Sequence, residues 1–230
     1  MAEDLRKSKE LLPMKLLVLG ASGGCGRWLA QLAAERGHQV TALVRPDTNF
    51  VAPAEVNVRR GQVLDPSDIE AAVTGQDIVL SCLGLRRAGP SPWARLLSPP
   101  DLMANVARIL IAVMRRQRIQ RLMVVSAGGV GDSAAQLTLP VQWLIDSGHL
   151  GAAYRDLENM EQELTTSGLD WLAVRPVTLV NGQPTGAAHP VEHYSMFSMV
   201  RRSDVAGWML SRAERPEPFE PRTVLLGSKY

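Results

Sequence analysis

The chain has 230 residues, of which 46% are hydrophobic and 21% charged, and a formal net charge of +2 at pH 7. A chain of this length and composition is large enough to bury a sizeable core, and one domain is the default expectation. The mild positive charge is far from the strong imbalance of a typical nucleic-acid or membrane-surface binder, so the composition predicts neither partner.

The N-terminal residues 1–13 carry acids and contain no long apolar stretch, so they fit neither a signal peptide nor a membrane anchor. We predict that they form a flexible extension and that residues 14–230 form a single domain. The two cysteines, Cys25 and Cys82, lie within or at the end of apolar segments, which is unlike a disulfide framework. A reducing cytoplasm is therefore the expected location.

Short apolar runs alternate with helical stretches along the rest of the chain. Buried strands are predicted over residues 16–19, 40–44, 77–83, 122–126 and 171–174, with a weaker strand over 57–59. Helices are predicted over residues 27–36, 67–73, 102–117, 155–166 and 204–212, and loops over 89–100 and 181–193. The alternation predicts an α/β fold with a Rossmann-like, doubly wound parallel sheet and a small C-terminal substrate lobe.

Residues 20–26, GASGGCG, stand between the first predicted strand and the first predicted helix. A turn there directs unpaired backbone N–H groups and the positive end of the helix dipole to one point, where a phosphate can be held. Glycine allows a ligand to approach closely and permits positive φ angles. The GxxGxxG spacing also fits a plain tight turn, but its place at the start of the alternating pattern predicts a dinucleotide pyrophosphate.

The end of the second predicted strand, LVRP at 43–46, bears on which dinucleotide is bound. An acidic residue at this point would bond the ribose 2′-hydroxyl of NAD. Arg45 stands there instead, and a guanidinium forms charge-assisted pairs with a 2′-phosphate. NADP(H) is therefore favoured over NAD(H), although a solvated arginine with Asp47 close by would give the same pattern.

Several segments taken together resemble one known family. They are GASGGCG at 20–26, LVRP at 43–46, GQVLDPSDIEAAVTGQDIVLSCLG at 61–84, VVSAGG at 124–129 and SGLDWLAVRPVTLVNGQPTG at 167–186. From about residue 14 to its C-terminus, the chain resembles the atypical short-chain dehydrogenase/reductase group, in the branch of the NmrA-like proteins and the biliverdin-IXβ/flavin reductases. The resemblance implies an NAD(P)-binding Rossmann-like domain.

The resemblance also implies a set of cofactor-binding residues. At the pyrophosphate it places Gly20, Ser22, Gly23, Gly24, Cys25 and Gly26. At the 2′-phosphate and the adenine it places Arg45, Gln62 and Val63. Gln62 replaces the usual aspartate of the family, and its amide can still bond the adenine edge. On the nicotinamide side the matching residues are Leu83, Gly84, Arg86, Ser126, Pro176 and Val177.

The candidate catalytic residues, Ser126 and Tyr154, depart from the standard pattern. Standard short-chain dehydrogenases use a Tyr-x-x-x-Lys pair, in which the ammonium lowers the pKa of the tyrosine. Tyr154 has Glu158 four residues on, and a carboxylate there would have the opposite effect. Packing for Tyr154, turn capping for Ser126 and a solvated acidic face formed by Glu158, Glu161 and Glu163 are alternative interpretations.

A conjugated acceptor takes its proton from water and needs mainly positioning over the nicotinamide, so its reduction does not require the absent lysine. We therefore expect an NADPH-dependent reductase that transfers hydride to a small conjugated acceptor of flavin, quinone, tetrapyrrole or enone type. The alternative is a non-enzymatic NADP(H)-sensing regulatory protein of NmrA-like type, which would have a protein partner.

Two groups of charged residues have plainer interpretations than ligand binding. The basic group complements a helix C-terminus without aromatic stacking partners, so nucleic acid is not predicted; its members are Arg115, Arg116, Arg118 and Arg121. The histidines fit no common metal spacing, so no metal is predicted; they are His149, His189 and His193.

Two further features leave alternatives open. Cys25, near a helix N-terminus, is either a redox-sensitive thiol or, preferably, a packing residue. Several apolar residues are expected along a substrate pocket, although packing in the core or a lid explains them equally well; they are Trp93, Met196, Phe197 and Met199.

Overall fold

In the computed structural model, which describes residues 12–86, 88–89, 91, 93–147 and 150–228, eight strands form one sheet in the order β3-β2-β1-β4-β5-β6-β10-β8. Their bounds are β1 Lys15–Leu19, β2 Gln39–Val44, β3 Val56–Arg60, β4 Ile78–Ser81, β5 Arg121–Val125, β6 Asp170–Pro176, β8 Ala188–Pro190 and β10 Thr223–Ser228. Neighbouring strands are parallel except β8, which runs antiparallel to β10. Two short strands, β7 Thr178–Val180 and β9 Met199–Arg201, pair beside this sheet.

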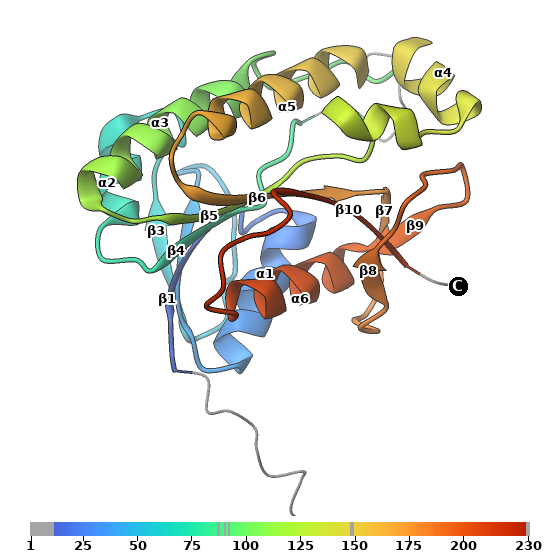
Figure 1. Ribbon diagram of the computed structural model, residues 1–230. Coiled ribbons are helices and arrows are strands. Elements are labelled where there is room, and N and C mark those ends of the chain that lie inside the picture. The colour runs from blue at the N-terminus through green and yellow to red at the C-terminus, as the bar shows by residue number, and fades with distance from the viewer. Residues whose placement is uncertain (1–11, 87, 90, 92, 148–149, 229–230) are drawn as a thin grey trace, which may run out of the picture.

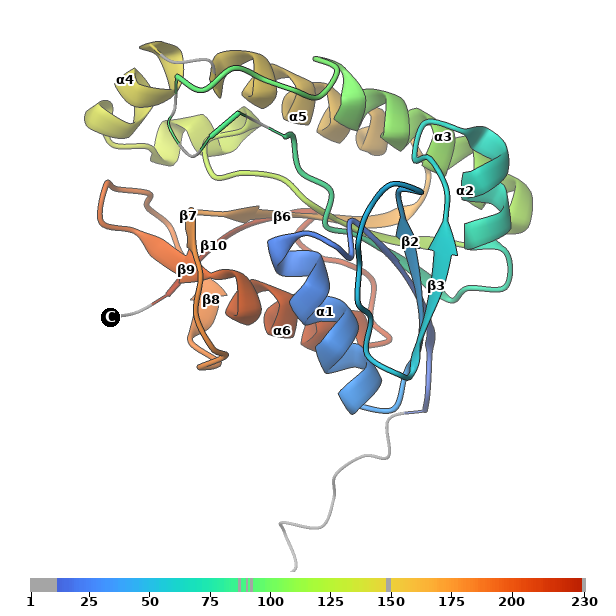
Figure 2. The same cartoon turned by 180° about the vertical axis from the view of Figure 1, so that it is seen from behind.

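Helices cover both faces of the sheet, which makes the fold doubly wound (Figure 1). Their bounds are α1 Gly24–Glu35, α2 Pro66–Val73, α3 Leu102–Gln117, α4 Leu139–Ser147, α5 Leu150–Thr165 and α6 Arg202–Ala213, with a 3₁₀ helix over Gly131–Gln136. Helices α2, α3 and α5 lie over one face and α1 and α6 over the other, as the view from behind also shows (Figure 2). No helix formed by the described residues is long and apolar enough to cross a membrane.

The core is divided by the sheet into two layers, and β1 shows why. Leu16 and Val18 pack on the side of α1 and α6, whereas Leu17 and Leu19 pack on the side of α2, α3 and α5. All four side chains are fully buried. A strand that is covered on both faces consists of a continuous apolar run, so the sequence predicts this strand clearly.

The strand order reverses at β1, because β2 and β3 lie on one side of it and β4, β5 and β6 on the other. In an open α/β sheet, the connections after the two strands at such a point leave in opposite directions and open a crevice at the carboxyl ends of the strands. The turn after β1 and the segment after β4 therefore form the two walls of the expected ligand site.

The predicted α/β fold with a doubly wound, largely parallel sheet is confirmed, and several details are corrected. The helix predicted from residue 27 begins at Gly24, because the glycines form its first turn despite their low helix propensity. The predicted loop over 181–193 contains β8, which is too short for its periodicity to be seen. Strand β10 and helix α4 were missed, and α5 begins at Leu150 rather than at 155.

Domain boundaries stay a prediction. The expected flexible extension, residues 1–13, lies outside the described residues apart from Leu12 and Pro13.

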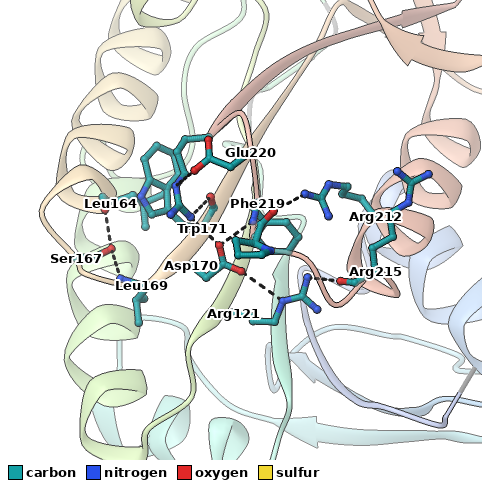
Figure 3. Close-up of polar contacts among 12 residues, drawn as sticks. Arg121, Leu164, Ser167, Leu169, Asp170, Trp171, Arg212, Arg215, Phe219 and Glu220 are labelled. Carbon is teal, nitrogen blue, oxygen red and sulfur yellow. Dashed lines mark hydrogen bonds and ion pairs between the residues drawn. The ribbon is translucent and has the colours of Figure 1, made fainter.

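The segment between α6 and β10 is anchored at the amino ends of β5 and β6 (Figure 3). Asp170 accepts the backbone N–H of Phe219 at 2.9 Å, and Arg121 donates to the carbonyl of Arg215 at 2.8 Å. The fully buried Phe219 ring has the guanidinium carbons of Arg121 and Arg212 at 4.5 and 5.0 Å from its centroid. These contacts fix the segment that leads into β10. They lie at the edge of the sheet opposite the carboxyl ends of the parallel strands.

Candidate functional site

The turn between β1 and α1 requires glycine at two positions. Gly20 has a φ of +76°, and a Cβ atom there would lie 2.7 Å from the carbonyl oxygen of Cys82. A Cβ atom at Gly26 would overlap the carbonyl oxygen of Gly20 and lie 2.8 Å from its carbonyl carbon. Helix α1 therefore starts in direct contact with the turn, and its first N–H groups stand at the reversal point of the sheet.

The first turn of α1 lacks the side-chain cap that α2 has. The residue before α1 is Gly23, no side chain accepts its first N–H groups, and no acidic residue lies in its first turn. In α2, by contrast, Asp65 accepts hydrogen bonds from the Ser67 hydroxyl and from the N–H groups of Ser67 and Asp68, and these bonds lower the pKa of its carboxyl. A helix start without an acid is suited to bind an external anion.

A cavity of about 320 Å³ lies at this point of the sheet, beside the turn and the ends of β2 and β4. Residues 97–99, at the end of the predicted loop over 89–100, line it as well. Eight of the residues predicted to bind the cofactor line it, namely Gly20, Ser22, Arg45, Gln62, Val63, Leu83, Gly84 and Arg86. Residues from four separate segments thus meet in one cavity.

Hydrogen bonds between side chains and the backbone hold the end of this cavity near Arg45 and Gln62. The backbone N–H of Gln62 donates to Asp68 at 2.7 Å, which fixes the turn that carries the predicted adenine contacts. Arg60 donates to the carbonyls of Pro46 and Thr48, which fixes the turn just after Arg45. These bonds order the backbone while leaving the side chains of Arg45 and Gln62 at the cavity.

Arg45 is weakly paired. Its side chain is 43% exposed, and its Nε atom lies 3.5 Å from a carboxylate oxygen of Asp47, which is itself 78% exposed. An exposed pair at this separation contributes little, so it does not hold the guanidinium in place. Arg45 is therefore free to turn toward an anion at the cavity.

Cys25 faces the core in the first turn of α1. Burial raises the pKa of its thiol to about 11, although the nearby charge of Arg202 acts in the opposite direction. Its burial agrees with packing, the preferred interpretation of Cys25, rather than with a redox-sensitive thiolate. Burial likewise raises the pKa of Cys82 well above its ordinary value.

Ser126 donates its hydroxyl hydrogen to the carboxylate of Glu161 at 2.6 Å and is 7% exposed. Glu161 also binds Arg175, which lies on β6 and is itself buried. The predicted solvated acidic face is thus wrong at Glu161, because strand alternation brings a buried arginine opposite it. Glu163 pairs with Arg108 at 2.7 Å near the surface.

Tyr154 lies near the start of α5, and its hydroxyl donates to the carbonyl of Gly128 at 3.2 Å. This contact ties α5 to the turn that follows β5. Glu158, one turn further along α5, is exposed. The contact agrees with the packing interpretation, and a catalytic role for Tyr154 or Ser126 stays a prediction.

The other nicotinamide-side residues lie at the end of β6. Pro176 is its last residue, and Val177 is 3% exposed and donates its N–H to Leu226 at 2.9 Å. Together with Ser126 they do not line the 320 Å³ cavity. The remaining predicted residues, Gly23, Gly24, Cys25 and Gly26, form the start of α1.

Three of the apolar residues expected along a substrate pocket are exposed. Trp93, Met196 and Phe197 are 53%, 51% and 84% exposed, so they do not pack in the core, whereas Met199 is half-buried in β9. The small C-terminal lobe is attached to the segment before α4, because Thr138 donates its N–H to the carbonyl of Tyr194 at 3.0 Å. On α4 the sequence analysis missed two exposed apolar residues, Leu139 and Trp143.

The basic and histidine groups take the following places. Arg115 donates to the carbonyl of Ser167 at 2.7 Å, and Arg116 lies 3.4 Å from Glu70. Arg121 lies in β5 rather than at a helix end. His149 lies outside the described residues. Among those residues, no three His, Cys, Asp or Glu side chains are grouped so as to hold a metal ion.

A larger hollow, about 790 Å³, lies between α5 and the strands β6 and β10. It is lined by Glu158, Glu161 and Asp132 beside Arg175 and Arg222, so its acids would repel a phosphate. None of the described residues that line it begins an α-helix. Chemistry, rather than size, therefore favours the smaller cavity as the candidate dinucleotide site.

A comparison with protein families and known proteins gives concordant matches. The family model described as NAD(P)H-binding matches residues 20–216. The uncharacterised protein YwnB of Bacillus subtilis is 26% identical over 93% of this chain and 98% of its own length.

Two solved structures are also similar. ChuY of Escherichia coli O157:H7, described as an anaerobillin reductase, is 26% identical, with a TM-score of 0.71 over 92% of this chain and 96% of its own. A short-chain dehydrogenase/reductase of Veillonella parvula, solved in complex with NADP, is 19% identical, with a TM-score of 0.72 over 94% of both chains. The second likeness concerns the fold alone.

The buried pair of Glu161 and Arg175 gives a stability prediction. Glu161→Gln leaves the Arg175 charge without its buried carboxylate, so the free energy of unfolding should fall by about 3 to 5 kcal/mol in urea denaturation. Glu163→Gln, two residues along the same helix, breaks only the surface pair with Arg108 and should change it by less than about 1 kcal/mol. Equal effects of the two substitutions would contradict this assignment.

Proposed function

Because the chain belongs to the NAD(P)H-binding family, we propose that it is an NADPH-dependent reductase of a small conjugated acceptor, of flavin, quinone, tetrapyrrole or enone type. Its membership and its likeness to ChuY confirm the predicted resemblance to the atypical short-chain dehydrogenase/reductase group. The observation that carries the proposal is the cavity where the glycine turn, Arg45 and Arg86 meet.

The residues at this cavity fit a dinucleotide. Side chains at Gly20 or Gly26 would collide with the backbone, so the turn keeps open the close approach that a pyrophosphate needs. The uncapped first turn of α1 offers N–H donors to the phosphates. Gln62 and Val63 lie at the other end of the same cavity, where the adenine is proposed to bind.

Arg45 supports the proposed preference for NADPH over NADH. The only carboxylate that pairs with it among the described residues is Asp47, and that pair is exposed and 3.5 Å long. A 2′-phosphate would offer a stronger, doubly charged partner in the same position. The 2′-hydroxyl of NADH carries no charge, so Arg45 would keep its weak pair with Asp47.

Bound NADPH supplies a hydride, and the residues of this chain position it and its acceptor. Leu83 and Gly84 line the cavity past β4, toward the proposed nicotinamide side. The exposed apolar side chains of Met196 and Phe197 in the small lobe, and of Trp93 in the loop over 89–100, are the proposed contacts for a flat, conjugated acceptor. A conjugated acceptor collects its proton from water, so this mechanism requires no proton donor from the chain.

One set of observations favours the alternative, a non-enzymatic NADP(H) sensor. Ser126 and Tyr154 both donate their hydroxyl hydrogens to groups of the protein, and Glu158 replaces the usual lysine. A protein without a proton relay is suited to binding the dinucleotide without turnover. The two functions differ in whether bound NADPH is oxidised.

The NADPH preference is tested by titrating NADPH and NADH into the wild type and Arg45→Ala while nicotinamide fluorescence is followed. Loss of one charge-assisted contact should lower the affinity for NADPH about tenfold or more and leave that for NADH nearly unchanged. Arg59→Ala, an exposed arginine on the neighbouring strand β3, is the control and should behave as the wild type. An unchanged ratio of affinities in Arg45→Ala would refute the role of Arg45.

Turnover is tested by adding FMN, menadione, a linear tetrapyrrole and an enone separately to the protein with NADPH. With at least one acceptor, the absorbance at 340 nm should fall at a rate about proportional to the protein concentration. The reason is that positioning alone accelerates hydride transfer. If NADPH binds tightly but no acceptor oxidises it, the reductase proposal is wrong and the sensor takes its place.

A further inference from the structure

Arg202 is the first residue of α6, but its side chain lies against the first residue of α1. A Cβ atom at Gly24 would overlap the Cδ atom of Arg202 and lie 2.9 Å from its Nε atom. The charge of Arg202 is also close enough to Cys25 to act on the pKa of that thiol. Two helices that meet on the same face of the sheet thus place a cation at the start of α1.

Among the described residues, the hydrogen bonds that hold the guanidinium involve its Nη1 atom. The Nη1 atom donates to the carbonyl of Leu179 at 3.2 Å and to the side-chain oxygen of Asn181 at 3.0 Å. Both acceptors are uncharged, and no ion pair among the described residues includes Arg202. A guanidinium has five N–H donors, so most of its capacity is left for another acceptor.

The positive end of the α1 dipole disfavours a cation at this position in the absence of an anion. The first turn of α1 contributes the positive end of its dipole and has no acidic residue. The nearest acid in the first turn of α6, Asp204, is engaged by the N–H and hydroxyl of Thr185 and by the N–H of Gly186. A negatively charged ligand would turn this repulsion into attraction.

We propose that Arg202 binds the pyrophosphate of the dinucleotide, so that the phosphates lie between its guanidinium and the first turn of α1. The inference rests on the proposed function, which puts the pyrophosphate at that turn. Arg202 then serves NADP(H) and NAD(H) alike, whereas Arg45 distinguishes between them. Because Arg202 also holds Leu179 and Asn181, it joins the dinucleotide to the small lobe.

The test measures dissociation constants of Arg202→Gln by isothermal titration calorimetry with NADP⁺ and NAD⁺, and by competition with adenosine 2′-monophosphate, which has no pyrophosphate. Loss of a contact between charged groups should weaken NADP⁺ and NAD⁺ by the same factor, about tenfold or more. The affinity for adenosine 2′-monophosphate should stay at the wild-type value, which also shows that the variant is folded.

Two further variants separate charge from structure. Arg202→Lys keeps the positive charge and should recover part of the affinity that Arg202→Gln loses. Arg201→Gln removes the neighbouring arginine, which donates to the carbonyl of Gln183, and should bind all three compounds as the wild type does.

Three results would overturn the inference. Wild-type affinity of Arg202→Gln for NADP⁺ would do so, as would an equal loss for adenosine 2′-monophosphate, which would indicate general damage. No recovery in Arg202→Lys would show that the charge is not what matters. If the wild type binds neither NADP⁺ nor NAD⁺, the proposed function fails as well, whereas the first three results leave it standing.

Discussion

The close contact between the start of α1 and the turn after β1 is the constraint on which the rest of the site depends. Gly26 packs on the carbonyl of Gly20, and Gly20 packs on the carbonyl of Cys82 after β4. These contacts put the positive end of a helix at the place where the strand order reverses. The cavity, its position between β2 and β4 and the anion binding that we propose there all follow from that placement.

Arg175, Arg45 and Arg202 differ in whether a nearby carboxylate forms a close ion pair with the guanidinium. Arg175 has the buried carboxylate of Glu161 and serves to hold β6 to α5. Arg45 has only a long, exposed pair, and Arg202 has uncharged acceptors. Arg45 and Arg202, which lack a strong ion pair among the described residues, stand at the two ends of the proposed anion site, as expected if a ligand supplies the missing charge.

Local patterns predicted strands β1 to β6 and the residues that line the cavity, whereas contacts between distant segments could not be predicted. The buried runs and the glycine turn are each contiguous in the sequence, so these strands and the cavity residues around Arg45 could be found. The partner of Glu161 depends on the face that β6 turns toward α5, and the pKa of Cys25 depends on its burial. Arg202 meets Gly24 only because α6 packs on α1, and no local pattern in the sequence indicates that contact.

The most direct test of the central claim is a titration of the isotope-labelled protein with NADP⁺, followed through the backbone amide resonances by NMR. If the start of α1 is the anion site, the largest shifts will occur at the amides of Gly23 to Gly26, with a second group at Arg45 and Gln62. If the largest shifts occur instead around the hollow between α5 and β6, at residues such as Thr165 and Gly168, the account of the site is wrong.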